Sequence, residues 1–122
     1  MNPPAITGQG QHLNLKTASS QEVADYLKSC TGIVLPTGSL EQHGPVGLIG
    51  TDAICVEEIA QSASEQSSML VAPVLNYAPA QFNLEFAGTI SLSAETFAKV
   101  FTEITTSLMR SGFDRIYILN GH

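Results

Sequence analysis

Two acids and two histidines in this 122-residue sequence have the residue types of metal ligands. Glu41 and His43 are two residues apart, so in an extended segment both side chains point the same way. Asp52 follows nine residues after His43, across a glycine-rich stretch long enough to return it to the same place. Carboxylates mixed with imidazole suit Zn, Mn or Fe rather than calcium, which prefers oxygen alone. The sequence therefore offers a candidate metal site.

His122 is the fourth candidate, although it lies far along the chain from the other three. It follows an expected strand at 115–119, and Glu41 follows a similar one at 33–36. In open α/β sheets, ligands bind beyond the carboxyl ends of the strands, so two strand ends can bring all four side chains to one pocket. Spacing alone leaves an alternative open, in which Glu41 is a solvated loop carboxylate and His43 is a loop imidazole bonded to backbone.

The elements that must hold these residues alternate between helix and strand. The patterns predict helices over about 20–29, 52–64 and 94–111, and strands over 33–36, 69–75 and 115–119. Ser19 and Glu22 match a capping box for the first helix, while Ser93 and Gly112 delimit the third. Such alternation predicts a parallel sheet with right-handed crossovers and helices on its faces. Both open edges of a three-stranded sheet need cover.

The composition narrows the classes of function. Charged residues make up 13% of the chain, against about 25% in an average domain, so we expect a partner, another subunit or missing chain to cover neutral surface. Five Lys plus Arg against eleven Asp plus Glu argue against nucleic acid. No run approaches the ~20 apolar residues of a membrane span. The first residues do not resemble a secretory signal, and the spacing of Cys30 and Cys55 indicates reduced thiols, so we expect a cytoplasmic protein.

Three stretches of the sequence carry a family resemblance. They are residues 38–45 with 50–52 (GSLEQHGP and GTD), residues 86–92 (FAGTISL) and residues 118–122 (ILNGH). In this order they resemble the motifs of the creatininase (creatinine amidohydrolase) family, and the match covers roughly residues 31–122. The resemblance implies a three-layer α/β/α fold with a mostly parallel sheet.

The resemblance also implies an activity, which is hydrolysis of a non-peptide, often cyclic, amide C–N bond with two divalent metal ions (Zn, Mn or Fe). It implies that Glu41 and His122 bind one ion, that His43 binds the other, and that Asp52 bridges both. A hydroxide held between the ions would attack the carbonyl of a small-molecule amide substrate, and a general acid would protonate the leaving nitrogen. We expect no nucleic-acid or membrane partner, and we expect a homo-oligomer.

The sequence departs from the family pattern at several positions. Ala87 replaces the usual Pro of the second motif, and Val46 stands where many members carry a second His. Asn83 stands where many relatives place a His before the second motif, which is expected to alter substrate contacts. The loss at Val46 is expected to change pocket polarity more than metal binding, because that position is not one of the ligands that the resemblance implies.

Family members continue well past the third motif. We therefore expect a loose N-terminal arm over residues 1–16 and, over 17–122, the N-terminal part of a creatininase-like domain that is apparently truncated after the third strand. The proton donor is expected beyond His122, so the chain alone is expected to be weakly active or inactive. The alternative is a non-catalytic α/β module that binds metal or a small ligand, or that assembles with other subunits.

Overall fold

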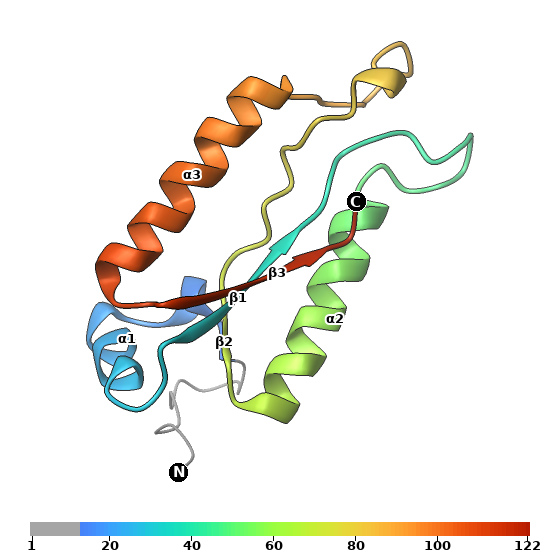
Figure 1. Ribbon diagram of the computed structural model, residues 1–122. Helices are drawn as coiled ribbons and strands as arrows, with labels where there is room; N and C mark the ends of the chain where they lie inside the picture. Colours follow the sequence, from blue (N-terminus) through green and yellow to red (C-terminus); the bar gives the residue numbers. More distant parts are fainter. Residues whose placement is uncertain (1–12) are drawn as a thin grey trace.

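Six helices and strands alternate along residues 13–122, the part of the chain that the computed structural model describes (Figure 1). The helices are α1 Ser20–Leu27, α2 Thr51–Ser67 and α3 Ala94–Ser111, and the strands are β1 Gly32–Thr37, β2 Leu70–Val71 and β3 Arg115–Asn120. Short 3-10 helices lie before α1 and before α3, at Leu15–Thr17 and Gln81–Asn83. The predicted alternation of helix and strand is confirmed.

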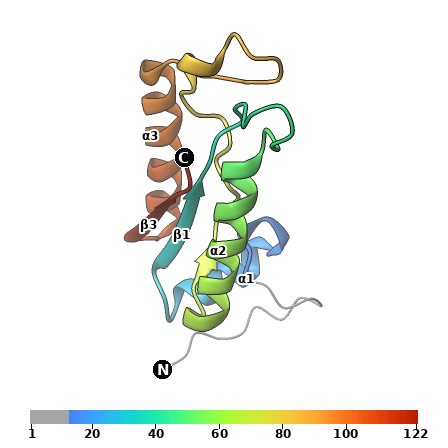
Figure 2. The same cartoon turned by 90° about the vertical axis from the view of Figure 1, so that its right-hand side faces the viewer.

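The three strands form a parallel sheet in the order β2-β1-β3. The central strand β1 is buried throughout, as expected for a parallel strand with helices on both faces. Ile33 and Leu35 belong to the core on the α1 and α3 side, whereas Val34 packs with Ala60 of α2. Two views place α2 and α3 on opposite sides of β1 (Figures 1 and 2). The expected α/β/α layering is therefore confirmed.

The predicted signals for helix ends are also confirmed. Glu22 N donates to Ser19 Oγ at 3.2 Å, and Ser19 N donates to Glu22 Oε2 at 2.7 Å, which completes the capping box. Thr96 N donates to Ser93 Oγ at 3.1 Å at the start of α3. Gly112 ends α3 with a φ of 118°, a left-handed conformation that suits glycine.

The second strand is much shorter than the prediction of residues 69–75. Pro73 has no backbone N–H and is exposed, so the regular ladder with β1 stops before it. The chain nevertheless continues alongside β1, because Leu75 N donates to Pro36 O at 2.9 Å. The pairing of this segment with β1 is therefore interrupted at Pro73 and resumes at Leu75. The apolar run in the sequence did not indicate this interruption.

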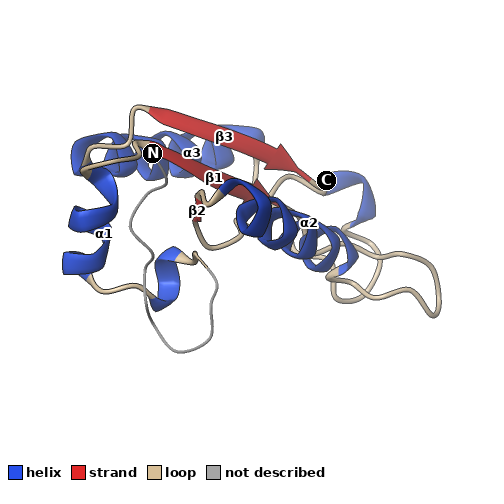
Figure 3. Cartoon of the chain, turned by 90° about the horizontal axis from the view of Figure 1, so that it is seen from below, coloured by secondary structure: helices blue, strands red, loops and turns tan. Residues whose placement is uncertain are grey.

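The N-terminal segment covers one edge of the sheet. Residues 1–12 of the predicted arm lie outside the described residues. Leu13 and Leu15, which the prediction also assigned to a loose arm, pack on the core, and Leu13 O accepts a hydrogen bond from Val71 N at 2.8 Å. Within residues 13–122 the opposite edge, along β3, stays uncovered, and Tyr117 and Ile118 are about half exposed (Figure 3).

Two expectations from composition bear on the described residues. Cys30 and Cys55 are both free thiols, and Cys30 packs against the core. Between residues 13 and 122, no helix is long and apolar enough to cross a membrane.

Candidate functional site

The candidate residues come from three segments that meet beyond the carboxyl end of the sheet. β1 ends at Thr37, and the chain then passes through the loop that carries Glu41 and His43. Asp52 is the second residue of α2, where the helix dipole favours a negative charge. His122 follows two residues after β3. The parallel pairing of β1 and β3 in register, up to Thr37 opposite Asn120, is what brings these segments together.

Gly121 allows β3 to approach the first turn of α2 closely. A Cβ atom at this position would lie 2.7 Å from Asp52 O and 2.7 Å from Val56 Cβ. Gly38 has the same role after β1, because a Cβ there would lie 2.7 Å from Ala53 Cα. Neither contact is compatible with a side chain, so both glycines are needed for the strand ends to flank the start of α2.

The end of β3 is also fixed by polar contacts. Thr37 Oγ1 donates to Asn120 Oδ1 at 3.1 Å, and His122 N donates to the same oxygen at 3.0 Å. Gly121 N donates to Thr37 O at 2.8 Å. These bonds hold the backbone of His122 beside β1 and so direct its imidazole toward the Glu41 loop.

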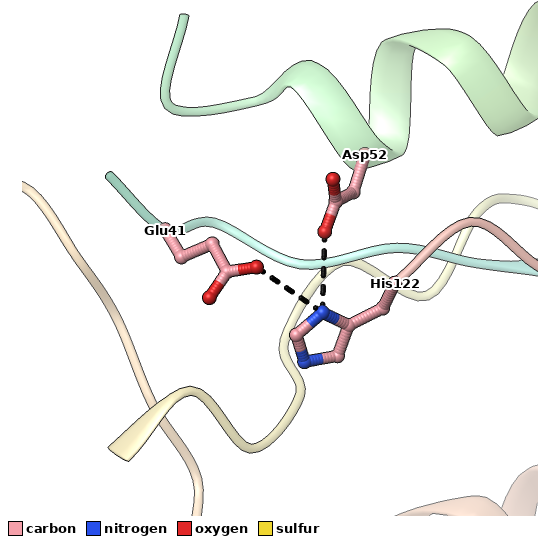
Figure 4. Close-up of side chains that lie close together, drawn as sticks. All are labelled: Glu41, Asp52 and His122. Carbon is pink, nitrogen blue, oxygen red and sulfur yellow. Dashed lines mark hydrogen bonds and ion pairs between the residues drawn. The ribbon is translucent and has the colours of Figure 1, made fainter. Parts of the chain in front are cut away.

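Glu41, Asp52 and His122 each offer one ligand atom, and these atoms all lie within 4.8 Å of one another (Figure 4). His122 Nδ1 lies 3.3 Å from Glu41 Oε1 and 3.2 Å from Asp52 Oδ2. The other oxygen of that aspartate, Oδ1, lies 3.2 Å from His43 Nε2. The structure thus brings all four predicted residues into one group, which we call the four-residue cluster, with one Asp52 oxygen facing each imidazole.

Both imidazoles also contact a backbone carbonyl through their second ring nitrogen. His43 Nδ1 lies 3.0 Å from Glu41 O, and His122 Nε2 lies 2.6 Å from Pro79 O. A carbonyl oxygen only accepts hydrogen bonds, so these ring nitrogens carry the proton and donate it. In a neutral imidazole the remaining nitrogen is then an acceptor. This nitrogen faces carboxylate oxygens, which are also acceptors. Two acceptors at this distance repel each other unless a cation or an added proton lies between them.

The electrostatics of the cluster favour charged forms. The hydrogen bond to the Glu41 carbonyl raises the pKa of His43 against the effect of burial, and the charges of Asp52 and Glu41 add to the rise. Burial alone would lower the pKa of His122, but the bond to the Pro79 carbonyl and the two nearby carboxylates raise it overall.

The carboxylate of Asp52 is likewise held in its ionised form. Burial acts to raise its pKa, but hydrogen bonds from Ser39 and His122 and the charges of both imidazoles lower it overall. The site is therefore arranged to keep a carboxylate ionised between two imidazoles.

Three contacts that support the site were not predicted from the sequence. Ser39 is fully buried and donates to Asp52 Oδ2 at 2.7 Å, and its place two residues before Glu41 was an available signal. Asn83, expected to affect substrate contacts, donates to Glu41 Oε2 at 2.8 Å. The Pro79 carbonyl is a backbone group, for which the sequence holds no signal.

A cavity adjoins His122 on the α3 side of the sheet. Its volume is about 230 Å³, and its lining includes Phe97, Phe101 and Ile118 together with Asn120 and His122. The two phenylalanine rings pack side by side, with centroids 6.2 Å apart. The cluster therefore has an apolar space next to it.

Comparison with known proteins identifies relatives of this chain. Residues 16–122 match the family model described as Creatininase: Creatinine amidohydrolase. The chain is 27% identical over 108 residues to 3-dehydro-scyllo-inosose hydrolase of Thermotoga maritima, covering 88% of this chain and 35% of that protein. It is 30% identical over 95 residues to creatinine amidohydrolase of Pseudomonas putida, covering 74% and 36%. It is also 31% identical over 100 residues to a mycofactocin precursor peptide peptidase of Mycobacterium tuberculosis, covering 74% and 39%.

Solved structures agree with the fold. A crystal structure of creatinine amidohydrolase aligns with a TM-score of 0.86 at 27% identity, over 91% of this chain and 45% of that one. A manganese form of creatininase aligns with a TM-score of 0.85, and a zinc–zinc form of a creatininase mutant with 0.83, each over 46% of the solved chain. The chain therefore spans less than half the length of these proteins. Because the family model covers most of the sequence, this chain belongs to the creatininase (creatinine amidohydrolase) family.

Proposed function

We propose that this protein is a metal-dependent amidohydrolase of the creatininase type, which hydrolyses an amide C–N bond in a small molecule and uses two divalent cations. The observation that carries the proposal is the four-residue cluster, in which imidazole nitrogens face carboxylate oxygens at 3.2–3.3 Å. The names of its relatives support hydrolysis, and two of those names specify an amide or peptide substrate. We take a cyclic amide as the first class to test.

The donor set fits divalent cations. Each imidazole gives its N–H to a carbonyl oxygen, an arrangement that fixes the ring and leaves the other nitrogen for a metal. Two carboxylates with two imidazoles suit Zn, Mn or Fe. The manganese and zinc forms among the solved relatives support the same choice.

The geometry suggests which ligands would hold each of the two cations. Glu41 Oε1, His122 Nδ1 and Asp52 Oδ2 would hold one cation, while His43 Nε2 and Asp52 Oδ1 would hold the second. Asp52 would then bridge the pair, because its two oxygens face different imidazoles. Ser39 holds this aspartate through Oδ2, so the bridge has a fixed orientation.

When bound, such a cation pair supplies a nucleophile from water at neutral pH and polarises the amide carbonyl. The contacts from Ser39 and from the backbone carbonyls orient the ligand side chains. The negative charge of Asp52 would offset the repulsion between two cations. The cavity lined by Phe97, Phe101 and Ile118 offers an apolar wall beside His122 for a small substrate. The leaving nitrogen needs a general acid, and we propose that this group is none of the four ligands.

Metal content and turnover test the proposal. We expect the purified 122-residue chain, loaded with Mn²⁺ or Zn²⁺, to bind metal, and we expect Asp52→Asn to lose both ions. Asp25→Asn makes the same change on α1, where the Asp25 side chain is 46% exposed next to Lys28, and should bind metal like the parent. Equal metal content in Asp52→Asn and the parent would contradict the bridging role.

Turnover is measured on creatinine and on a panel of small cyclic amides, by detection of the ring-opened product. We expect weak or no turnover by the chain alone, as the sequence predicted. Robust turnover with two bound metals would contradict that expectation, and its loss on chelation would support the reaction class. A chain that binds no metal and turns over no amide would sink the proposed function.

The second candidate is a non-catalytic α/β module that assembles with other subunits. The half-exposed Tyr117 and Ile118 on the edge strand β3 favour this candidate. It predicts that Asp52→Asn leaves the oligomeric state unchanged and that no cyclic amide is hydrolysed, whether or not metal is bound.

A further inference from the structure

A line of hydrogen bonds outside the four-residue cluster leads to Glu41. Gly44 N donates to Gln42 Oε1 at 2.9 Å, and Gln42 Nε2 donates to Asn83 Oδ1 at 3.0 Å. Asn83 Nδ2 then donates to Glu41 Oε2 at 2.8 Å. Two side-chain amides thus connect a backbone N–H to a carboxylate that faces His122. We call Gln42 and Asn83 the amide relay.

The direction of the amide relay is fixed at both ends. The backbone N–H of Gly44 can only donate, so Gln42 must present its oxygen there and its NH₂ group to Asn83. The carboxylate of Glu41 accepts, so Asn83 must present its NH₂ group to it. The oxygen and nitrogen of a side-chain amide are hard to tell apart by shape. Here the neighbouring donors and acceptors allow only one orientation of each amide.

The amide relay also joins two loops that lie far apart in the sequence. Gln42 stands between Glu41 and His43, and its backbone N donates to Thr89 Oγ1 at 3.1 Å. Asn83 ends the short helix Gln81–Asn83 in the connection before α3. Both relay side chains are part-buried, so water competes less for these bonds than at the surface.

The two oxygens of Glu41 are consequently not equivalent. Oε2 is occupied by Asn83, and Oε1 lies 3.3 Å from His122 Nδ1. A carboxylate without such a partner rotates about its last torsion, which is broad and roughly two-fold. Asn83 therefore selects which oxygen points into the cluster.

We propose that Gln42 and Asn83 are positioning residues that orient Glu41 so that its Oε1 alone is offered to a metal ion. This inference rests on the proposed metal-dependent function. Neither residue touches the cation in this scheme, and each acts through Glu41. Partners of this kind typically change metal affinity by about 10–100-fold when removed.

Cobalt binding tests the amide relay without any assay of activity. Asn83→Ala removes the donor to Glu41. Gln42→Glu keeps the shape of the side chain but replaces its NH₂ group with an acceptor, so Asn83 must turn its own NH₂ group away from Glu41. Gln81→Glu adds the same charge on an exposed residue of the same short helix and serves as the control.

Two readouts are taken from each variant, the Co²⁺ dissociation constant by competition with a chromogenic chelator and the visible absorption spectrum of the bound Co²⁺. We expect Asn83→Ala and Gln42→Glu to bind Co²⁺ about 10–100-fold more weakly than the parent, with altered spectra, and Gln81→Glu to match the parent. Thermal unfolding of the metal-free proteins separates positioning from loss of folding. If Asn83→Ala unfolds, the isosteric Gln42→Glu decides the test.

The outcomes distinguish the inference from the function on which it rests. Parent-like affinity and spectra in both variants would overturn the amide relay and leave the metal site intact. Weakening in Asn83→Ala alone would overturn the part assigned to Gln42. Failure of the parent chain itself to bind Co²⁺ would overturn the proposed function and the inference together.

Discussion

Gly121 connects the packing of a single residue to the geometry of the site. It lies between β3 and His122, and a Cβ atom at this position would lie 2.7 Å from both Asp52 O and Val56 Cβ of α2. An added methyl group must push the end of β3 away from α2. His122 Nδ1 would then move away from Asp52 Oδ2, from which it lies 3.2 Å in the native arrangement.

For Gly121→Ala we expect a loss of about 1–3 kcal/mol in the free energy of unfolding, as for other overpacked sites. We also expect metal affinity to fall by about 10-fold or more, because the proposed ligand His122 is displaced. Thermal and urea unfolding measure the first effect, and chelator competition measures the second.

Gly50→Ala is the matched control for this prediction. Gly50 also lies next to the start of α2, but its φ is -86° and an added Cβ would lie 3.6 Å from the nearest atom, Ile54 Cδ1. The control should therefore bind metal normally. Normal metal binding by Gly121→Ala as well would show that the close approach does not position His122.

Much of the candidate site could be predicted from residue types and order. Glu41, His43, Asp52 and His122 were identified because carboxylates and imidazoles follow two expected strands and precede an expected helix. Their supporting contacts could not be predicted in the same way. His122 contacts the backbone carbonyl of Pro79, and every residue type has such a carbonyl. The contact from Asn83 to Glu41 spans 42 positions, and no local pattern indicates it.

At the scale of elements, α1 is a short helix that depends on its first turn. Its capping box joins Ser19 and Glu22, and the hydrogen bonds from Ser19 lower the pKa of the exposed Glu22 carboxyl below its ordinary value. A carboxyl with a lowered pKa in the folded state stabilises the fold at higher pH. That stabilisation is lost as the pH falls from the ordinary Glu pKa through the lowered folded-state pKa.

Glu22→Gln is expected to abolish this pH dependence, because Gln can fill the capping box but does not titrate. At pH 7 the parent should melt at a higher temperature than Glu22→Gln, and the difference should shrink toward pH 3. Thermal unfolding followed by circular dichroism across that range measures it. Glu58→Gln removes the same charge from an exposed position of α2 and controls for net charge. A difference in melting temperature between parent and Glu22→Gln that stays the same at every pH would contradict the prediction.

The elements themselves could be predicted where local signals decide the structure. The bounds of α3 follow from Ser93 and Gly112, and they agree with the structure to the residue. The length of β2 could not be predicted, because it depends on which backbone groups meet β1 rather than on hydrophobicity. The packing of Leu13 and Leu15 on the core was missed for a similar reason, since these two residues stand in a polar segment.

At the scale of the whole molecule, large apolar side chains gather on two loops near the site. The loop after Glu41 and the connection before α3 are joined by the pairing of Leu40 with Ile90. Val46 is 94% exposed and Phe82 is 97% exposed. Leu84 and Phe86 are about half exposed, and we call these four side chains the exposed loop residues. Apolar surface of this kind favours association, in line with the homo-oligomer expected from the low charge content.

We expect the purified chain to self-associate and the double variant Val46→Ser/Phe82→Ser to shift toward the monomer. Size-exclusion chromatography with light scattering over a range of concentrations measures the change. Ile59→Ser alters an exposed apolar residue on α2, outside the two loops, and should leave the mass unchanged. A monomeric parent at every concentration would contradict the expected oligomer.

The expected cytoplasmic location of the protein also stays a prediction.

The edge position of β3 has a consequence for how the site is held together over time. Amide hydrogens of an outer strand with half-exposed side chains exchange with solvent sooner than those of a buried strand such as β1. His122 follows the end of this outer strand, so one of the proposed ligands is attached to an exposed edge of the sheet. A cation shared by Glu41, Asp52 and His122 would tie that strand to β1 and α2, and its removal would free the strand to fray.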